Sequence, residues 1–341
     1  MRQMLSRIKV GIVAPSSRVP RVELKLGAKK ILDEGFDVAI HPQCWKGHSF
    51  FAGTDEQRAK AFFEVAKDPN LSIVWVARGG SGALRILPLL EKMAKTRGAP
   101  KQKKLFIGYS DTTVLMEYAR KEWGWSILHG PMPSMRRFSI LPEADWVALR
   151  GWIRGKPSPT PWASRRLQFW HKKPTSAVEA PVVGGNLTVW ANALGTPYEP
   201  NAKGCFLFLE DVDEALYRID RTLQQLILSG SLNGIRGILL GNFLNCKETV
   251  PLVLKRAPSK AQFTNVLAAP QPDDLQPLRR RFKEISALKR IFSEVGQILG
   301  VPVAYGLPVG HGPEVSPLPL GARYRLTPEG RLQLLNWDWL K

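Results

Sequence analysis

The sequence predicts an α/β fold: an N-terminal, Rossmann-like parallel sheet flanked by helices, then a C-terminal mixed α/β domain, with the active site in the interdomain cleft. Over the first 135 residues, short apolar runs alternate with helical patterns, which is typical of a parallel sheet covered by helices. The chain of 341 residues exceeds the usual size of a single core, so two domains are expected. A change of composition near residue 155 indicates the boundary between them.

The elements of the first domain follow from local periodicity. Apolar runs rich in β-branched residues predict strands at residues 10–14, 36–40, 73–77 and 105–107. Helical spacing of apolar residues predicts helices at 22–32, 54–66, 83–95 and 113–121. Functional loops of such sheets cluster beyond the carboxyl ends of the strands. The segments Pro15-Ser16, Gly79-Gly80 and Ser110 all fall there.

Proline and basic residues mark residues 156–180 as a linker between a first domain of residues 1–155 and a second of residues 181–341. Beyond it, apolar runs predict strands at 204–209 and 237–241, and helical spacing predicts a helix at 215–228. Residues 251–290 are predicted to form an inserted basic loop with helical turns, because three consecutive arginines at 279–281 do not pack in a core.

The segment Gly108-Tyr109-Ser110-Asp111 is the strongest indication of chemistry. It follows an apolar run and precedes a helical pattern, and α/β enzymes mount nucleophilic serines at such strand-to-helix corners. Gly108 permits a sharp turn, which would project the Ser110 hydroxyl and direct backbone N–H groups at an oxyanion. These four residues alone are equally consistent with Ser110-Asp111 acting as a helix N-cap.

Three further polar segments each end an apolar, strand-like run: Arg78-Gly79-Gly80-Ser81-Gly82, Glu210-Asp211 and Gly310-His311-Gly312. A serine nucleophile needs a base, and the His311 imidazole can take a proton and return it to a leaving amine near neutral pH. A carboxylate must orient that imidazole. Glu210 is favoured for its position beside the strand, and Asp211 remains a rival.

The glycine-rich segment 78–82 has two interpretations. It lacks the lysine of a Walker motif and the spacing of a dinucleotide-binding turn, so a nucleotide site is disfavoured. The backbone N–H of Gly80, together with that of Asp111, is instead predicted to form an oxyanion hole, worth a few kcal/mol per donor in the transition state.

In the order Ser110, Glu210, His311, these segments resemble the LD-carboxypeptidase family of serine peptidases, which includes murein tetrapeptide carboxypeptidases and related microcin-immunity hydrolases. Eight short strings in the family's order carry the resemblance over nearly the whole chain. They lie at residues 11–17, 52–59, 78–82, 108–113, 129–132, 184–198, 209–221 and 306–311. The chain departs from the family pattern at Ser81, where a tyrosine is common, and after Cys246, where it looks longer than usual.

The resemblance implies hydrolysis of the amide between the L-centre of meso-diaminopimelate, or lysine, and the terminal D-alanine of a murein tetrapeptide, in peptidoglycan recycling. It also implies a homodimer, and it favours His311 as the base over His129, which is expected to brace the first domain. The free carboxylate of that substrate calls for a partner near Ser110, so Arg78 and Ser81 are candidate substrate contacts. Arg78 is equally suited to holding the glycine loop. No cofactor is expected, and no metal, because no cluster of His, Cys and carboxylate has ligand spacing.

Three alternative functions stay open. A microcin-immunity type hydrolase would use Ser110, Glu210 and His311 on an acyl-sulfamoyl or peptidyl-nucleotide amide. A non-catalytic muropeptide-binding protein is disfavoured by an intact triad. A nucleic-acid-associated protein would account for the net charge of +20. Much of that charge lies at residues 150–173 and 247–290, outside the motifs, and no nucleic-acid-binding pattern accompanies it, so a solvated basic surface is favoured.

A cytoplasmic location is predicted from two features. The three cysteines are widely spaced and odd in number, which argues against a disulfide framework and fits a reducing compartment. The basic residues at 1–7 precede an apolar stretch that is too short for a signal peptide, and no apolar run approaches the length of a membrane span.

Overall fold

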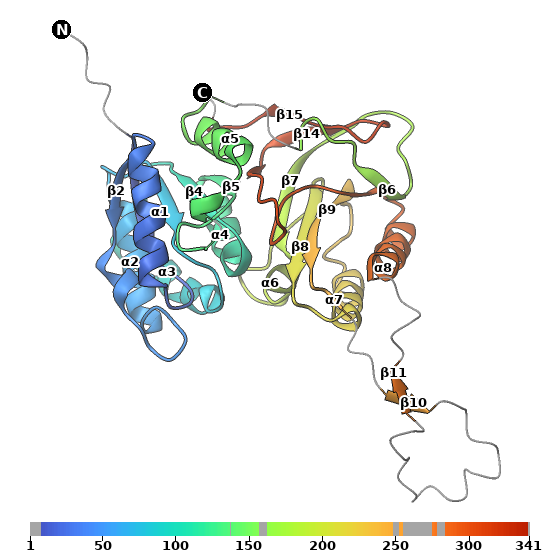
Figure 1. The fold of residues 1–341 in the computed structure, drawn as a ribbon, viewed down its shortest axis with the longest axis horizontal. Coiled ribbons are helices and arrows are strands. Elements are labelled where there is room, and N and C mark those ends of the chain that lie inside the picture. The colour runs from blue at the N-terminus through green and yellow to red at the C-terminus, as the bar shows by residue number, and fades with distance from the viewer. Residues whose placement is uncertain are drawn as a thin grey trace, which may run out of the picture.

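The two large β-sheets lie side by side, each with helices packed against it (Figure 1). The computed structural model describes residues 8–136, 138–156, 162–247, 252–254, 275–277 and 284–339. The predicted α/β class is confirmed, with an N-terminal parallel sheet and a mixed second domain. In the part of the chain that the structure describes, no helix combines the length and apolar character needed to cross a membrane.

The first sheet has the strand order β13-β5-β4-β3-β1-β2, in which β1 to β5 run parallel and β13 is antiparallel to β5. Its strands are β1 (Lys9–Val13), β2 (Asp37–Ile40), β3 (Ile73–Val76), β4 (Leu105–Gly108), β5 (Ser126–His129) and β13 (Leu318–Leu320). β3 and β4 are buried throughout, which explains their continuous apolar sequence. Because β1, β3 and β4 are neighbours and parallel, the loops at their carboxyl ends meet at one edge of the sheet.

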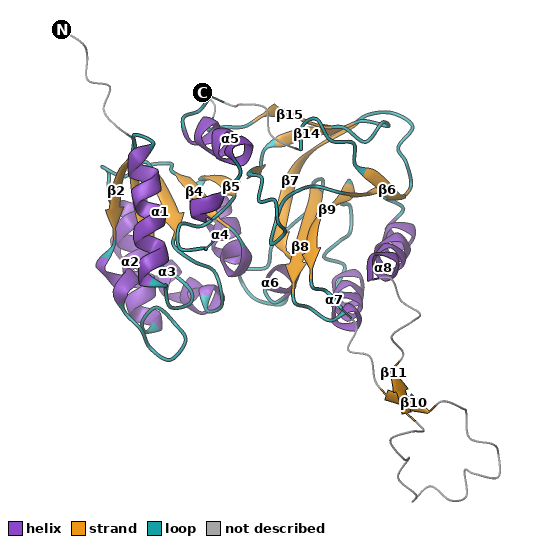
Figure 2. Ribbon diagram, viewed as in Figure 1, coloured by secondary structure: helices purple, strands orange, loops and turns teal. Residues whose placement is uncertain are grey.

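All but the last of the helices of the first half connect these strands (Figure 2). They are α1 (Arg21–Asp33), α2 (Asp55–Lys67), α3 (Ala83–Arg97), α4 (Thr113–Trp123) and α5 (Glu143–Ile153), with the short 3₁₀ turns η1 (Pro42–Trp45), η2 (Ser110–Thr112) and η3 (Phe138–Ile140). The start of α2 shows how local sequence sets such boundaries. Thr54 and Gln57 form a capping box, in which each side chain accepts a hydrogen bond from the other residue's backbone N–H.

The second sheet has the order β15-β14-β7-β8-β9-β12-β6. Its strands are β6 (Gln168–His171), β7 (Val178–Asn186), β8 (Phe206–Val212), β9 (Gly237–Leu244), β12 (Val303–Tyr305), β14 (Arg323–Leu326) and β15 (Leu332–Asn336). The central strands β7, β8, β9 and β12 are parallel, whereas β6, β14 and β15 pair antiparallel at the edges. The helices are α6 (Leu187–Ala191), α7 (Leu216–Leu228) and α8 (Glu284–Leu299).

The structure differs from the sequence-based division of the chain at two places. The predicted linker of residues 156–180 contains β6, the start of β7 and the buried Trp162, whose Nε1 donates to Pro317 O over 2.9 Å. This segment is therefore partly built into the core, because its tryptophans find apolar partners despite the proline-rich, basic composition. In addition, β13 pairs with β5, so residues expected in the second domain complete the first sheet.

Most of the predicted basic insert, residues 251–290, lies outside the described residues. The exceptions are β10 (Leu252–Leu254) and β11 (Leu275–Pro277), which pair antiparallel with each other, and the first residues of α8.

Gly184 illustrates how closely β7 and β8 approach. Its φ is +130°, and a Cβ built there would lie 1.9 Å from Phe208 O. We expect Gly184→Ala to lower the free energy of unfolding by about 3 kcal/mol or more, because backbone strain and overpacking both add to the cost. Gly195→Ala is the matched control: φ is +70° there, but no neighbouring atom lies within 4 Å of the built Cβ. Urea unfolding that ranks the control as the more damaging change would contradict this account.

Candidate active site

Ser110 occupies a strained corner between β4 and α4. It is the first residue of η2, and its φ of +65° is one of the few positive values at non-glycine positions among the described residues. A left-handed backbone costs free energy at such a residue and persists only where the surroundings enforce it. The side chain is partly exposed. This is the geometry of a nucleophile elbow, which projects the hydroxyl away from the sheet.

The glycine loop after β3 lies directly against Ser110. A Cβ built at Gly79 would be 3.0 Å from Ser110 Oγ, so any larger residue there would crowd the hydroxyl. At the next position, Gly80 has a φ of +109°, and a Cβ would be 2.2 Å from Ser17 Oγ. The predicted oxyanion donors, the N–H groups of Gly80 and Asp111, therefore belong to two segments that meet at the carboxyl edge of the sheet.

Two residues that the sequence analysis did not single out hold this loop in place. Ser17 Oγ accepts from Ser81 N over 3.1 Å, and Ser17 N donates to Gly79 O over 3.2 Å. Arg58 of α2 is fully buried and donates through Nη1 to the carbonyl oxygens of Pro15 and Gly82. An arginine inside a helical pattern carries no local signal for such a role. Ser17 stands in the Pro-Ser-Ser loop after β1, which could have indicated it.

The Asp111 side chain serves the same loop. Its Oδ2 accepts from Ala83 N over 2.9 Å at the start of α3. Burial raises the pKa of the Asp111 carboxyl, against the lowering effect of its hydrogen bonds and of Arg58. The carboxyl group is thus occupied in joining the serine corner to α3, and only the backbone N–H of Asp111 remains a candidate for substrate contact.

Glu210 and His311 form the second half of the site. His311 Nδ1 lies 2.7 Å from Glu210 Oε2, and the His311 backbone N–H donates to the same oxygen over 3.2 Å. Because a carboxylate can only accept, Nδ1 carries the proton and Nε2 presents a lone pair. Gly310 permits this approach: its φ is +108°, and a Cβ there would lie 2.6 Å from Glu210 Oε2.

Each member of the Glu210–His311 pair shifts the pKa of the other. Burial lowers the pKa of His311, but the Glu210 carboxylate more than offsets this, so the pKa of His311 is raised above its ordinary value. Burial raises the pKa of Glu210, but His311 outweighs it and the net pKa of Glu210 is lowered. Glu210 is fully buried, whereas the His311 side chain is 15 % exposed. The carboxylate therefore stays ionised while the imidazole keeps access to a ligand.

Strand β8 separates Glu210 from Asp211. The predicted strand 204–209 extends as β8 to Val212, so Glu210 and Asp211 lie within the strand and not beyond its end. Successive side chains of a strand point to opposite faces of the sheet, so the two carboxylates point in opposite directions. Asp211 is turned to another task, with Oδ2 accepting from the N–H and hydroxyl of Thr188 at the start of α6. The structure thus sets Glu210, and not Asp211, against His311.

The two halves of the site meet across the sheets. The ring centroids of His311 and Tyr109, the residue before Ser110, are 4.7 Å apart. His129 lies behind them and is fully buried, with its ring 5.3 Å from Tyr109 and 5.2 Å from Phe208 of β8. It contacts both sheets, so it does more than brace the first domain. Burial lowers the pKa of His129 to about 4, which keeps it neutral at neutral pH.

Arg78 and Ser81, the candidate substrate contacts, are both exposed beside the glycine loop. Arg78 Nη1 donates to Arg18 O over 2.9 Å, and Ser81 contributes its backbone N–H to Ser17. Both therefore help to shape the loop whose Gly79 lies against Ser110. Within the described ranges, no three or more His, Cys, Asp or Glu side chains are grouped as metal ligands.

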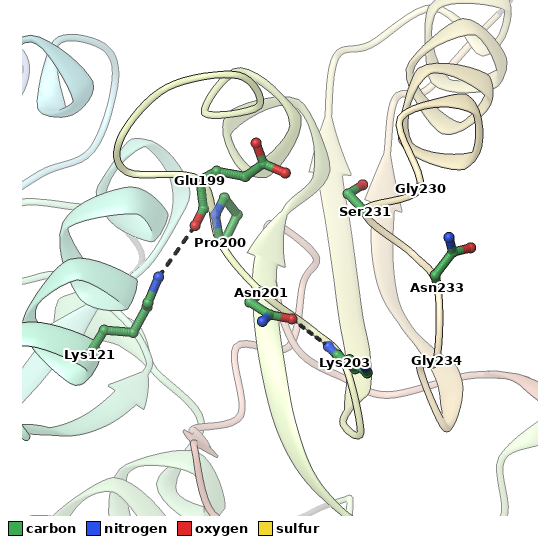
Figure 3. Close-up of a pocket in the computed structure, with 9 residues that line it drawn as sticks. All are labelled: Lys121, Glu199, Pro200, Asn201, Lys203, Gly230, Ser231, Asn233 and Gly234. Atoms are coloured by element: carbon green, nitrogen blue, oxygen red, sulfur yellow. Dashed lines mark hydrogen bonds between the residues drawn. The ribbon is translucent and has the colours of Figure 1, made fainter.

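A separate, polar pocket of about 500 Å³ lies between α4 and the second domain (Figure 3). Lys121 reaches it from α4 and donates to Glu199 O over 3.4 Å, while Lys203 N donates to Asn201 Oδ1 over 2.8 Å on its other side. None of Ser110, Glu210 and His311 lines this pocket.

Comparison with known proteins places this geometry in a family. Residues 10–130 match the LD-carboxypeptidase N-terminal domain, and residues 179–326 match the LD-carboxypeptidase C-terminal domain. A Rickettsia conorii protein named as a carboxypeptidase is 33% identical over 256 residues, which cover 74% of this chain and 78% of that protein.

Two solved structures resemble the whole chain. The muramoyltetrapeptide carboxypeptidase from Oxalobacter formigenes is 29% identical, with a TM-score of 0.69 over 96% of this chain and 97% of its own. The microcin C7 self-immunity protein MccF shares the fold at 19% identity, with a TM-score of 0.74 over 98% of this chain and 97% of its own. With both of its domains matched and the serine corner in place, the chain belongs to the LD-carboxypeptidase family and is a serine-type carboxypeptidase.

Proposed function

We propose that this enzyme hydrolyses the amide between the L-centre of meso-diaminopimelate, or lysine, and the terminal D-alanine of murein tetrapeptides. The observation that carries the proposal is that His311, hydrogen-bonded to Glu210, packs against Tyr109, the residue before Ser110. The chain also aligns along nearly its whole length with a muramoyltetrapeptide carboxypeptidase. The product would be a tripeptide suited to peptidoglycan recycling.

The mechanism assigns one task to each group. Ser110 Oγ attacks the scissile carbonyl carbon while its proton passes to His311 Nε2. The carbonyl oxygen becomes an oxyanion that accepts hydrogen bonds from the N–H groups of Gly80 and Asp111. The C–N bond then breaks, His311 returns the proton to the amine of D-alanine, and an acyl-enzyme remains. Water attacks that ester with His311 again as base, which releases the tripeptide and restores Ser110. Glu210 orients His311 and stabilises its cationic form throughout.

Recognition of the terminal carboxylate is assigned to the exposed edge of the glycine loop. The Arg78 guanidinium has five N–H donors, and its bond to Arg18 O uses one of them. A carboxylate held there would lie beside Ser110, as an exopeptidase requires. Ser81 adds a hydroxyl on the same loop.

The test is release of D-alanine by the purified protein from a disaccharide-free murein tetrapeptide, with EDTA present and with the pentapeptide as a second substrate. We expect release from the tetrapeptide alone, because the pentapeptide ends in a bond between two D-residues. A folded protein that releases no D-alanine would overturn the substrate assignment. Cleavage of an acyl-sulfamoyl nucleotide would then indicate the microcin-immunity type activity, and muropeptide binding without turnover would indicate a binding protein.

The predicted homodimer and the predicted cytoplasmic location belong to the same proposal. Sedimentation equilibrium would test the first, and fractionation of cells that produce the protein would test the second.

A further inference from the structure

Thr113, the first residue of α4, makes two hydrogen bonds through one hydroxyl group. Its Oγ1 donates to Ser110 O over 2.7 Å and accepts from Asn186 N over 3.1 Å. The residue is only 1% exposed. Ser110 belongs to the first sheet's serine corner, whereas Asn186 ends β7 of the second sheet. One hydroxyl therefore joins the nucleophile segment to the second domain.

The carbonyl group that Thr113 holds shares a peptide unit with the N–H of Asp111. A trans peptide unit is planar, so its C=O and N–H point in opposite directions. The Thr113 backbone N–H also donates to Ser110 O, which gives this oxygen two partners from the same residue. Fixing the direction of the Ser110 carbonyl therefore fixes the direction of the Asp111 N–H.

The serine corner needs such an anchor. Ser110 has a φ of +65°, and a strained residue of this kind relaxes unless neighbouring groups hold it. A rotation of the peptide unit between Ser110 and Asp111 would turn the Asp111 N–H away from the position of the oxyanion. An oxyanion hole stabilises the transition state only when its donors are already in place.

The anchor is itself fixed by the second domain. A Cβ built at Gly185 would lie 2.6 Å from Thr113 Oγ1, so only glycine allows this contact. Asn186 Nδ2 donates to Asp211 Oδ1 over 2.9 Å, and Asn186 is the register partner of Glu210 on β8. The segment that holds Thr113 is therefore the segment beside the carboxylate that orients His311.

We propose that Thr113 is a positioning residue that aims the Asp111 N–H into the oxyanion hole, and that it does so from an anchor on β7 of the second domain. The inference rests on the proposed function, because it takes Ser110 as the nucleophile and the Asp111 N–H as an oxyanion donor. The Asn186–Thr113 bond links this anchor to the packing of the two sheets, because it forms only where they lie side by side.

The alternative is that the Thr113 hydroxyl only stabilises the turn that leads into α4, through its bond to Ser110 O. Such a bond would contribute to stability without a specific effect on kcat. Thr113→Val removes the hydroxyl and keeps the shape, whereas Thr113→Ser keeps the hydroxyl and removes a methyl group. Thr196→Val is a matched control, because Thr196 Oγ1 also donates to the carbonyl three residues before it, Ala193 O, and accepts from a backbone N–H, that of Tyr198.

With the tetrapeptide as substrate, we expect Thr113→Val to lower kcat on the order of 10- to 100-fold with little change in KM, as expected when a reacting geometry is misaligned. Thr113→Ser should retain most of the wild-type kcat, and Thr196→Val should retain all of it. Thermal unfolding of each variant shows that it is folded. Equal kcat for Thr113→Val and Thr113→Ser would overturn the proposal, as would a loss in Thr196→Val as large as that in Thr113→Val.

A second measurement separates this inference from the substrate assignment. An alkyl fluorophosphonate labels Ser110 without a peptide substrate. Ser110 Oγ bonds to phosphorus and fluoride leaves, while His311 takes the hydroxyl proton and the phosphoryl oxygen occupies the oxyanion position. We expect Thr113→Val to slow Ser110 labelling by the same factor as kcat. Wild-type protein that is labelled but does not cleave the tetrapeptide would refute the substrate assignment alone. The role of Thr113 would still be tested by the labelling rate of Thr113→Val relative to that of the wild type. Equal labelling of wild type and Thr113→Val would refute the role of Thr113 alone.

Discussion

Ser110→Ala is expected to lower kcat for D-alanine release about 10⁶-fold, the loss seen when a serine hydrolase loses its nucleophile. Without Oγ no acyl-enzyme forms, and the oxyanion hole and substrate binding alone supply the residual rate. Alanine has about the same backbone strain as serine at a φ of +65°, so the free energy of unfolding should change by no more than about 1 kcal/mol. Substrate binding should persist, which equilibrium dialysis with the intact tetrapeptide can show.

Ser139→Ala is the matched control for this experiment. Ser139 is an exposed serine on η3 whose Oγ donates to Arg136 O, and it lies outside the site. Its substitution should leave kcat unchanged. If Ser110→Ala kept more than about a hundredth of the wild-type rate, Ser110 could not be the nucleophile, because hydrolysis by oxyanion stabilisation alone is far slower.

Glu210→Gln should lower kcat about 10⁴-fold, because an amide can present the wrong group to His311. If its NH₂ group donates to Nδ1, the imidazole proton moves to Nε2 and the ring can no longer accept the proton of Ser110. If its oxygen accepts instead, the tautomer is kept but the imidazolium of the transition state has lost its counter-charge. The two side chains are nearly identical in size, so packing around this buried position changes little.

The pH profile of the same variant provides a direct test of the electrostatics. Only neutral His311 can act as a base, so kcat/KM falls as the pH drops through the pKa of His311. Because Glu210 raises that pKa above 6.5, the acid limb of the wild-type profile should lie above pH 6.5. Removal of the carboxylate charge should shift the limb of Glu210→Gln to lower pH. Stopped assays of D-alanine release across the pH range would measure both limbs.

The pair also links stability to pH. A raised pKa means that folded protein binds the His311 proton more tightly than unfolded protein does. The stabilisation is therefore complete below about pH 6.5 and is lost as the pH rises through the raised pKa.

Glu34→Gln is a suitable control for the pH profile of Glu210→Gln, because Glu34 pairs with Arg150 away from the site. An acid limb that stays in place in Glu210→Gln would refute the assigned role of Glu210.

Part of the molecule could be predicted from local sequence. The strands and helices of the first domain follow the period of the apolar residues, and each predicted element there has a counterpart in the structure within a few residues. The polar segments after β3 and β4 were predicted to converge for the same reason, because parallel strands bring their carboxyl ends together. The family could be predicted because its short strings are contiguous in the sequence.

Other features depend on contacts between residues far apart in the sequence, and no local pattern encodes them. The buried Trp162 donates a hydrogen bond to the carbonyl oxygen of Pro317. Strand β13 completes a sheet whose other strands end at residue 129. Glu210 lies against His311, whereas Asp211 accepts from Asn186 and Thr188. The choice between the two carboxylates was therefore open in the sequence and is decided by these contacts.

The sequence by itself determined the fold class, the position of a serine between a strand and a helix, and the residue types available for acyl transfer, because apolar period, glycine placement and polar strand ends are properties of short segments. Only the tertiary structure decided which groups meet. The hydrogen bond between Glu210 and His311 spans 101 residues of chain, and that between Thr113 and Asn186 spans 73. Directional bonds of this kind form only where the packing of two sheets brings both partners to within about 3 Å, and that packing is a property of the whole chain.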